Sequence, residues 1–247
     1  MSASILLSDN KLASNLLRVK LIGCPSTQKE VESLGLTGGM DCEYLDFSYH
    51  AAPDQLQKEL QKKIDNSQDY SAIVLTYGRC SKATAGLVSP KAPIVLPRVH
   101  DCFELLLGCG EKRRMLADRN PAAYYFSAGW LDYGRSPYAE YREYVERYGE
   151  EEARYLIEAL YGKYCEAIFV KTCLQEDTEK YRVKLKEIAA FFCWAVGEVE
   201  GDLSLLRALV TGTRLRDDVI HIPPGKPVCW ESLDERQCTG EGGGSNE

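Results

Sequence analysis

The chain has 247 residues, of which 45% are hydrophobic and 27% are charged, and its formal net charge is -7. This composition is typical of a globular protein with enough length for one large or two small cores. The acidic balance lacks the basic surface of nucleic-acid binders, and no apolar run approaches the roughly 20 residues of a membrane span. We therefore expect partners other than nucleic acid or membranes.

Residues 1–17 are expected to form an N-terminal extension. The apolar residues of this segment are interrupted by Asp9, Asn10 and Lys11. A basic start, a continuous apolar stretch and a cleavage site, which mark a secretory signal peptide, are missing from it. This pattern predicts a cytoplasmic location.

Short apolar segments then alternate with helical patterns. The apolar segments, typical of strands buried on both faces, are 19–23, 42–47, 72–77, 93–97, 123–126, 166–170, 194–199 and 218–223. Segments with helical periodicity are 53–66, 102–108, 138–160, 177–194 and 203–210. The alternation predicts an α/β fold with a mainly parallel sheet and helices on both faces.

The helical segment 137–162 interrupts this alternation. This segment is one long helix or two, with a break at Gly149. It either divides the α/β domain, 18–226, into two lobes, 18–136 and 163–226, or forms one longer crossover. Residues 227–247 are polar and end in GEGGGSNE. Such a composition predicts a disordered tail.

Three of the ten cysteines follow the ends of predicted strands: Cys24, Cys80 and Cys102. Ligands of an open parallel α/β sheet bind beyond the carboxyl ends of its strands, so we expect these thiols to converge. Cys42, Cys165 and Cys193 lie inside periodic segments and are expected to be small buried side chains.

Three converging cysteines favour a metal site. Three thiolates suit a [4Fe–4S] cluster with one open iron, or a zinc ion that His100 or water completes. Without a metal, one cysteine would be a nucleophile, with His100 as its base and Asp101 orienting that base. A structural role for His100, with Asp101 as the N-cap of helix 102–108, also fits the pattern.

Basic residues near the same strand ends indicate an anion site. Arg79 and Lys82 follow Gly78 at a turn that resembles an anion cradle, although an ordinary strand-to-helix turn has the same composition. We assign Arg79, Lys82 and Arg98 to binding an anionic small-molecule substrate. Trp130 is expected to wall the ligand pocket or to lie in the core.

Five blocks of the sequence resemble the family catalogued as domain of unknown function 1638. They are LTYGRCSKATAGL, PIVLPRVHDCFELLLG, YYFSAGWLDYG, RYGEEEARYLIE and EGDLSLLRALV, and the resemblance covers about residues 18 to 225. It implies an α/β protein of bacteria and archaea, often anaerobes, whose gene frequently lies beside genes of corrinoid-dependent methyltransferases. The positions that match are Cys24, Gly78, Cys80, His100, Asp101, Cys102 and Trp130.

These observations together predict a metal site formed by Cys24, Cys80 and Cys102, with His100 and Asp101 in catalytic roles. An iron–sulfur cluster is favoured over zinc because three thiolates leave one iron open. The expected protein is an enzyme or accessory factor of anaerobic methyl or one-carbon metabolism, with a small-molecule substrate and a corrinoid protein or methyltransferase as partner.

Two alternatives belong to other classes. One is a non-catalytic binding or chaperone module for a corrinoid protein or a small ligand, and the other is a metal-free thiol enzyme. The DxHxxG signature of corrinoid binding is absent around His50, His100 and His221, which disfavours direct corrinoid binding of the standard kind.

Overall fold

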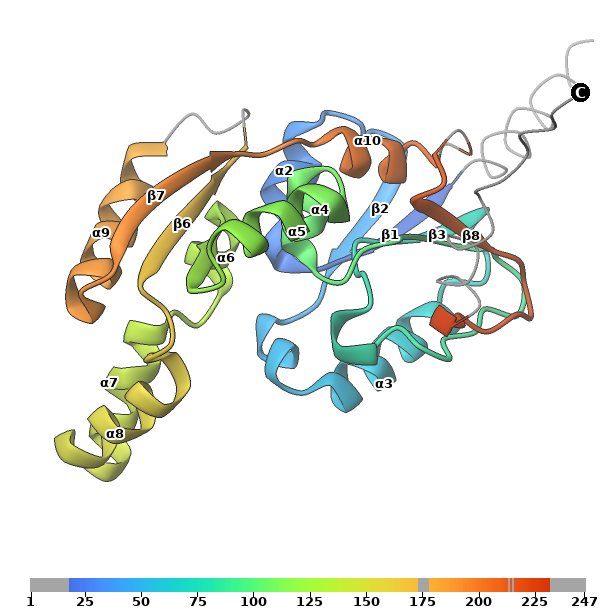
Figure 1. Cartoon of the computed structure of the whole chain (residues 1–247). Helices are drawn as coiled ribbons and strands as arrows, with labels where there is room; N and C mark the ends of the chain where they lie inside the picture. The colour runs from blue at the N-terminus through green and yellow to red at the C-terminus, as the bar shows by residue number, and fades with distance from the viewer. Residues whose placement is uncertain (1–17, 173–177, 213, 215, 232–247) are drawn as a thin grey trace, which may run out of the picture.

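A computed structural model of the chain describes residues 18–172, 178–212, 214 and 216–231. The expected N-terminal extension, 1–17, lies outside the described residues. The strands form one sheet of five strands and one of three, and helices α2, α4, α5 and α10 lie between the two sheets (Figure 1). The predicted α/β fold is confirmed.

The five-stranded sheet is parallel except at one edge. Its strands, in spatial order, are β2 (Met40–Tyr44), β1 (Val19–Gly23), β3 (Ala72–Leu75), β4 (Ile94–Pro97) and β8 (Val219–Ile222). Only β8 runs antiparallel to its neighbour, β4. The carboxyl ends of β1, β3 and β4 therefore lie side by side at one edge, where the connecting loops meet.

The three-stranded sheet is parallel throughout. Its order is β5 (Ala123–Phe126), β6 (Glu166–Lys171) and β7 (Ala195–Glu200). The segment 137–162 does not separate the two sheets, because β5 precedes it and pairs with β6, which follows it. The chain then returns to the five-stranded sheet with β8. The sheet boundaries therefore differ from the expected lobes, 18–136 and 163–226.

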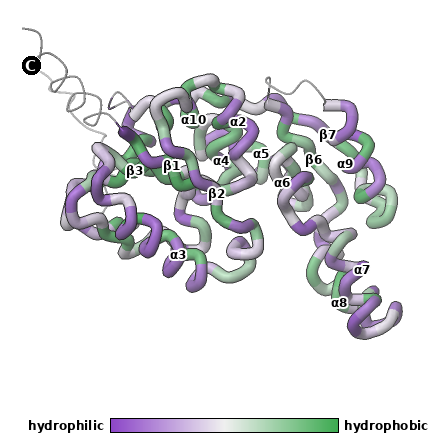
Figure 2. Tube along the Cα trace, turned by 180° about the vertical axis from the view of Figure 1, so that it is seen from behind, coloured by the Kyte–Doolittle hydropathy of each residue, from purple (hydrophilic) through white to green (hydrophobic). Residues whose placement is uncertain are grey.

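Helices cover both faces of the five-stranded sheet. One face packs against α3 (Pro53–Asp65), whose buried residues are Leu56, Leu60 and Ile64. The opposite face packs against α2 (Gln28–Ser33), α4 (Cys102–Leu107) and α10 (Ser204–Val210), and this core continues into the second sheet. Figure 2 shows that α3 is largely hydrophilic along its length, as expected of a helix with one buried stripe.

The remaining helices belong to the second sheet and its connections. They are α5 (Gly110–Arg119), α6 (Ala128–Tyr133), α7 (Pro137–Tyr148), α8 (Glu150–Tyr161) and α9 (Thr178–Phe192). The predicted helix 138–160 is two helices, which break at Gly149, where φ is 89°. None of the described helices is long and apolar enough to span a membrane.

The C-terminal segment corrects one prediction. Residues 227–231 were expected to begin a disordered tail, but Val228 and Trp230 are buried, with 2% and 4% of their surfaces exposed. Val228 exchanges backbone hydrogen bonds with Gly86 and Leu87. The low mean hydropathy of the tail hides these two anchors, and residues 232–247 lie outside the described part of the chain.

An ion-pair cluster around Asp132 joins α2, which packs on the five-stranded sheet, to α6 and α9 beside the three-stranded sheet. The Asp132 carboxylate on α6 accepts hydrogen bonds from Lys29 on α2 and from Tyr181 and Lys184 on α9, the last two at 2.8 and 3.1 Å. Burial alone would raise the pKa of Asp132, but these hydrogen bonds outweigh it and lower the pKa to about 2. The charged carboxylate therefore stabilises the fold.

Asp132→Asn should lower the free energy of unfolding at pH 7 by about 1–2 kcal/mol. The folded-state pKa of about 2 lies below the ordinary aspartate value of 3.8, so this contribution to stability is present above pH 4 and is lost as the pH falls towards 2. Urea unfolding of wild type and variant between pH 7 and pH 2.5 measures it. The two curves should converge at low pH, and Asp118→Asn, an exposed change on α5, should differ little from wild type throughout.

The backbone of α6 closely approaches the backbone of the loop after β1 at Gly129, near the start of α6. A Cβ atom on Gly129 would lie 2.3 Å from the carbonyl oxygen of Ser26 in the loop after β1. No side chain fits at that distance, and the obstacle is backbone. Glycine at this position lets α6 pack against the loop that carries Cys24.

Gly129→Ala should destabilise the protein by about 1–3 kcal/mol, because the methyl group must push the two segments apart. Thermal unfolding compared with Gly38→Ala checks this, since a Cβ on Gly38 meets no heavy atom within 4 Å. Equal midpoints for the two variants would show that α6 does not press on this loop.

Candidate functional site: a thiol-lined pocket

Cys24, Cys80 and Cys102 line one pocket at the carboxyl edge of the five-stranded sheet. They follow β1, β3 and β4, which are adjacent in the sheet. The pocket has a volume of about 430 Å³, and its wall includes His50, Tyr77, His100 and Asp101. The structure thus brings together three cysteines that lie 78 residues apart at most in the chain.

Backbone pairing beyond the strands holds two of the cysteines in place. The amides of Arg79 and Cys80 donate to the carbonyl oxygens of Val99 and His100, at 2.8 and 3.0 Å. The loops after β3 and β4 therefore run side by side. Gly78 makes this pairing possible, because a Cβ atom there would lie 2.3 Å from the Val99 oxygen.

The turn that presents Cys80 has an unusual backbone. Cys80, Ser81 and Lys82 have φ angles of 43°, 55° and 74°, so three consecutive residues with side chains are left-handed. Each such residue costs roughly 1–2 kcal/mol relative to a right-handed conformation. Backbone strain of this kind concentrates at functional sites, where surrounding contacts maintain it.

Buried hydroxyl groups hold Cys24. Its amide donates to Thr76 Oγ1 at 2.9 Å, and Thr76 in turn shares a hydrogen bond of 2.9 Å with Thr27 Oγ1. The hydroxyl of Ser26 donates to the Cys24 sulfur at 3.0 Å. Ser26, Thr27 and Thr76 are at most 1% exposed. These contacts fix the first cysteine against the loop after β3.

The three thiols are strongly biased towards the protonated form. Burial raises the pKa of Cys24, and it raises the pKa of Cys80 to about 12, with a further contribution from the nearby Cys24. Burial and then Cys24 raise the pKa of Cys102 well above its ordinary value. Hydrogen bonds involving Ser26 lower the pKa values of Cys24 and Cys102, and one involving the Gly78 backbone lowers that of Cys80, but burial outweighs them.

Asp101 and His100 occupy different positions in this pocket. The Asp101 side chain caps α4 by accepting a hydrogen bond from the Glu104 amide at 3.0 Å, as the capping interpretation predicts. His100 is exposed, and its amide donates to Glu104 Oε2 at 2.6 Å. Burial lowers the pKa of His50, a second imidazole on the wall, while the Asp101 carboxylate raises it.

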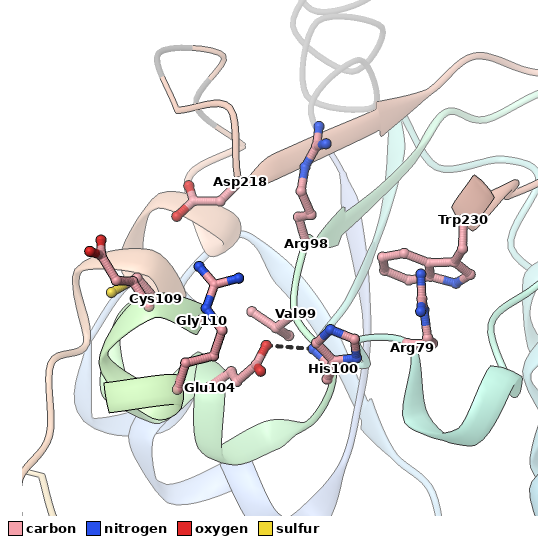
Figure 3. Close-up of a pocket in the computed structure, with 11 residues that line it drawn as sticks. Arg79, Arg98, Val99, His100, Glu104, Cys109, Gly110, Asp218 and Trp230 are labelled. Carbon is pink, nitrogen blue, oxygen red and sulfur yellow. Dashed lines mark hydrogen bonds between the residues drawn. The ribbon is translucent and has the colours of Figure 1, made fainter. Parts of the chain in front are cut away.

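A second pocket of about 300 Å³ shares His100 and Arg79 with the thiol pocket, and Figure 3 shows its lining. Arg79 and His100 line both pockets, whereas Arg98 lines only the second. Lys82 is exposed and lines neither. Two of the three basic residues assigned to an anion from the sequence therefore meet at this pocket, and the third does not.

Trp130 lies outside the thiol pocket. It is 7% exposed and packs edge-on against His50 and Phe47, with ring centroids 4.7 and 5.0 Å apart. It lines a larger cleft of about 1160 Å³ that shares His50 and Phe47 with the thiol pocket. Its indole Nε1 is buried and has no hydrogen-bond partner among the residues that the structure describes. Trp130 thus separates the cleft from the core.

A family model described as "Protein of unknown function (DUF1638)" matches residues 44–210. The chain belongs to this family. No curated protein and no solved structure gives a significant match. Within this DUF1638 protein, the matched range contains Cys80, His100 and Cys102, whereas Cys24 precedes it and Trp230 follows it.

The other cysteines that the structure describes in this DUF1638 protein do not line the thiol pocket. Cys165 and Cys193 are exposed and Cys42 is half-buried, so the prediction that they are small buried side chains is wrong. Cys42 lies on the edge strand β2, and Cys165 and Cys193 lie in the short connections before β6 and β7, where periodicity does not guarantee burial. Cys173 lies outside the described residues.

Several residues of the site were not predicted from the sequence. Thr76 and Tyr77 are the last two residues of the predicted segment 72–77 and directly follow β3 in the structure, so their position at a strand end was a usable signal. Ser26, His50 and Trp230 gave no such signal, because their roles depend on contacts with segments distant in the chain.

Within the described ranges, no group of three or more His, Cys, Asp or Glu side chains has the arrangement that holds a metal ion.

Alkylation of the metal-free, reduced protein should discriminate between the two sets of cysteines. At pH 8, Cys165 and Cys193 should react with iodoacetamide at least about tenfold faster than Cys24, Cys80 and Cys102, because burial and raised pKa values leave little accessible thiolate. Peptide mass spectrometry over time gives the rates. A pocket cysteine that reacts as fast as Cys165 would contradict the protonated state described above.

Proposed function

We propose that the thiol pocket binds a thiophilic metal centre through Cys24, Cys80 and Cys102. The observation that carries this proposal is the meeting of three thiols at three adjacent strand ends, one of them buried and two half-buried. A nucleophilic cysteine needs a lowered pKa, whereas burial raises the pKa of all three of these thiols. A metal supplies the positive charge itself and displaces the thiol protons.

An iron–sulfur cluster is the favoured occupant and zinc is the alternative. Three thiolates would leave one iron of a [4Fe–4S] cluster open as a Lewis acid, whereas zinc would take a fourth ligand such as His100 or His50. The thiols must draw closer together around either group, because their present arrangement is not that of a formed metal site. Metal binding and local ordering are coupled in many such sites.

The residues around the thiols have separable roles in this proposal. Ser26 and Thr76 fix Cys24, and the pairing of Gly78–Cys80 with Val99–His100 fixes the other side of the pocket. His100, exposed between two pockets, would accept or donate a proton at a bound substrate. Asp101 would orient the start of α4 and, through it, Cys102.

We further propose that the protein acts in the cytoplasm as an enzyme or accessory factor of anaerobic methyl or one-carbon metabolism. This part of the proposal is supported by the gene neighbourhood that the family resemblance implies. A corrinoid protein or methyltransferase is the corresponding partner. The large cleft beside Trp130, which adjoins the thiol pocket through His50 and Phe47, offers room for such contacts.

A metal-free ligand pocket is the second candidate function. It is favoured by the raised pKa values of the thiols and by the absence of a formed ligand set in the described part of the chain. In that case Cys24, Cys80 and Cys102 would be neutral walls of a cavity for a small molecule. The two candidates differ in whether the purified protein carries metal.

Protein purified without oxygen should contain iron and acid-labile sulfide, or zinc, in stoichiometric amount. The triple variant Cys24→Ala, Cys80→Ala, Cys102→Ala should lose it. The matched control, Cys42→Ala, Cys165→Ala, Cys193→Ala, removes the same number of thiols elsewhere and should retain it. Elemental analysis, sulfide determination and visible absorption measure these contents.

Absence of metal from the wild-type protein, after reconstitution with iron and sulfide and separately with zinc, would favour the metal-free pocket. Equal metal in the two triple variants would place the metal elsewhere and contradict the proposed ligands.

A further inference from the structure

The second pocket, which shares His100 and Arg79 with the thiol pocket, has the construction of an anion site. Its wall includes three arginines from three different segments: Arg79 after β3, Arg98 after β4 and Arg114 on α5. A guanidinium group matches the two oxygens of a carboxylate or phosphate. A protein of net charge -7 has no general excess of cations to explain this grouping.

Arg79 is held in position by the C-terminal segment. Its guanidinium lies over the ring of Trp230, 5.3 Å from the centroid. Trp230 is itself fixed, because its indole Nε1 donates to Thr84 Oγ1 at 3.0 Å, and Thr84 donates to the Gly78 carbonyl at 2.7 Å. Figure 3 shows Arg79 beside this ring at one side of the pocket. Such preorganisation lowers the entropy cost of binding a ligand.

The acidic residues of the pocket are largely engaged elsewhere. Glu104 is 6% exposed and accepts the His100 amide, and Asp218 forms a two-pronged ion pair with Arg216 at 2.7 and 2.8 Å. Glu111, in the first turn of α5, is exposed to solvent. Arg79 and Arg114 therefore line a cavity in which two of three carboxylates already have partners, whereas Arg98 donates from Nε to the Asp217 carbonyl at 3.2 Å and points away from His100 in Figure 3.

We propose that this pocket binds the oxyanion end, a carboxylate or a phosphate, of a small molecule. Arg79 and Arg114 provide the charge, and Trp230 is a positioning residue for Arg79. Because Arg79 and His100 line both pockets, a molecule anchored here extends past His100 towards the thiols. That extension rests on the proposed function, whereas oxyanion binding does not.

The test uses the full chain at low ionic strength in a chloride buffer. Inorganic phosphate and acetate are titrated separately, and the arginine Nε–H signals are followed by NMR in arginine-labelled protein. Saturable binding of at least one anion is expected, and the tighter of the two identifies the phosphate or the carboxylate as the preferred group. Arg79→Gln and Arg114→Gln should each weaken binding about tenfold, the loss expected for one charge-assisted hydrogen bond.

Arg142→Gln, an exposed change on α7, is the matched control and should leave binding unchanged. Arg114 is exposed on α5, so that its variant is expected to fold even if Arg79→Gln does not. No saturable binding of either anion, or equal weakening in Arg142→Gln, would overturn the proposal.

The triple cysteine variant separates this proposal from the metal site. Unchanged anion binding in folded Cys24→Ala, Cys80→Ala, Cys102→Ala protein supports an arginine site that is independent of metal. Loss of anion binding in that variant would assign the anion to the thiol pocket instead and overturn the inference.

Discussion

The pairing of two loops beyond the ends of β3 and β4 is the constraint on which the site depends. The amides of Arg79 and Cys80 bond to the carbonyls of Val99 and His100, so the sheet in effect continues past its last strand residues. Gly78 allows the approach, since a side chain there would collide with the Val99 oxygen. The same pairing puts Cys80 near Cys102 on one side and Arg79 near Arg98 on the other.

The rest of the fold supports this edge from two directions. Beside the second sheet, α6 packs against the loop that carries Cys24, with Gly129 in close contact with Ser26. The Asp132 cluster joins α2, α6 and α9. The C-terminal segment approaches from the other side and pins the turn after β3 through Trp230 and Thr84. Strain in the left-handed turn Cys80–Lys82 can persist because contacts on both sides maintain it.

The arrangement gives the two pockets opposite characters. The thiol pocket contains three thiols whose pKa values burial raises, and the adjoining pocket contains arginines whose charge is permanent. His100 stands between them and is the one imidazole shared by both walls among the described residues. A molecule with an anionic end and a reactive end would find a partner for each.

Much of this could be predicted from the sequence because it depends on local patterns. Apolar runs located all eight strands of the structure, and the rule that ligands bind at strand ends selected the three cysteines that share a pocket. The Asp101 cap followed from its position before an apolar helix. These features need only the residues beside them.

What could not be predicted depends on contacts between distant segments. The return of β8 to the first sheet and the burial of Trp230 are set by packing against residues more than 100 positions away. Lys82 has the same local signal as Arg79, but the left-handed turn between them directs it to solvent. The burial of a cysteine also depends on such packing, which explains the exposure of Cys165 and Cys193.

The most direct measurement of the central claim is anomalous X-ray diffraction from crystals of protein purified without oxygen, recorded on both sides of the iron and zinc absorption edges. The metal-site proposal predicts one strong peak bounded by the sulfurs of Cys24, Cys80 and Cys102, present above one of the two edges and lost below it. A metal peak elsewhere, or three separate reduced thiols around a metal-free cavity, would contradict it.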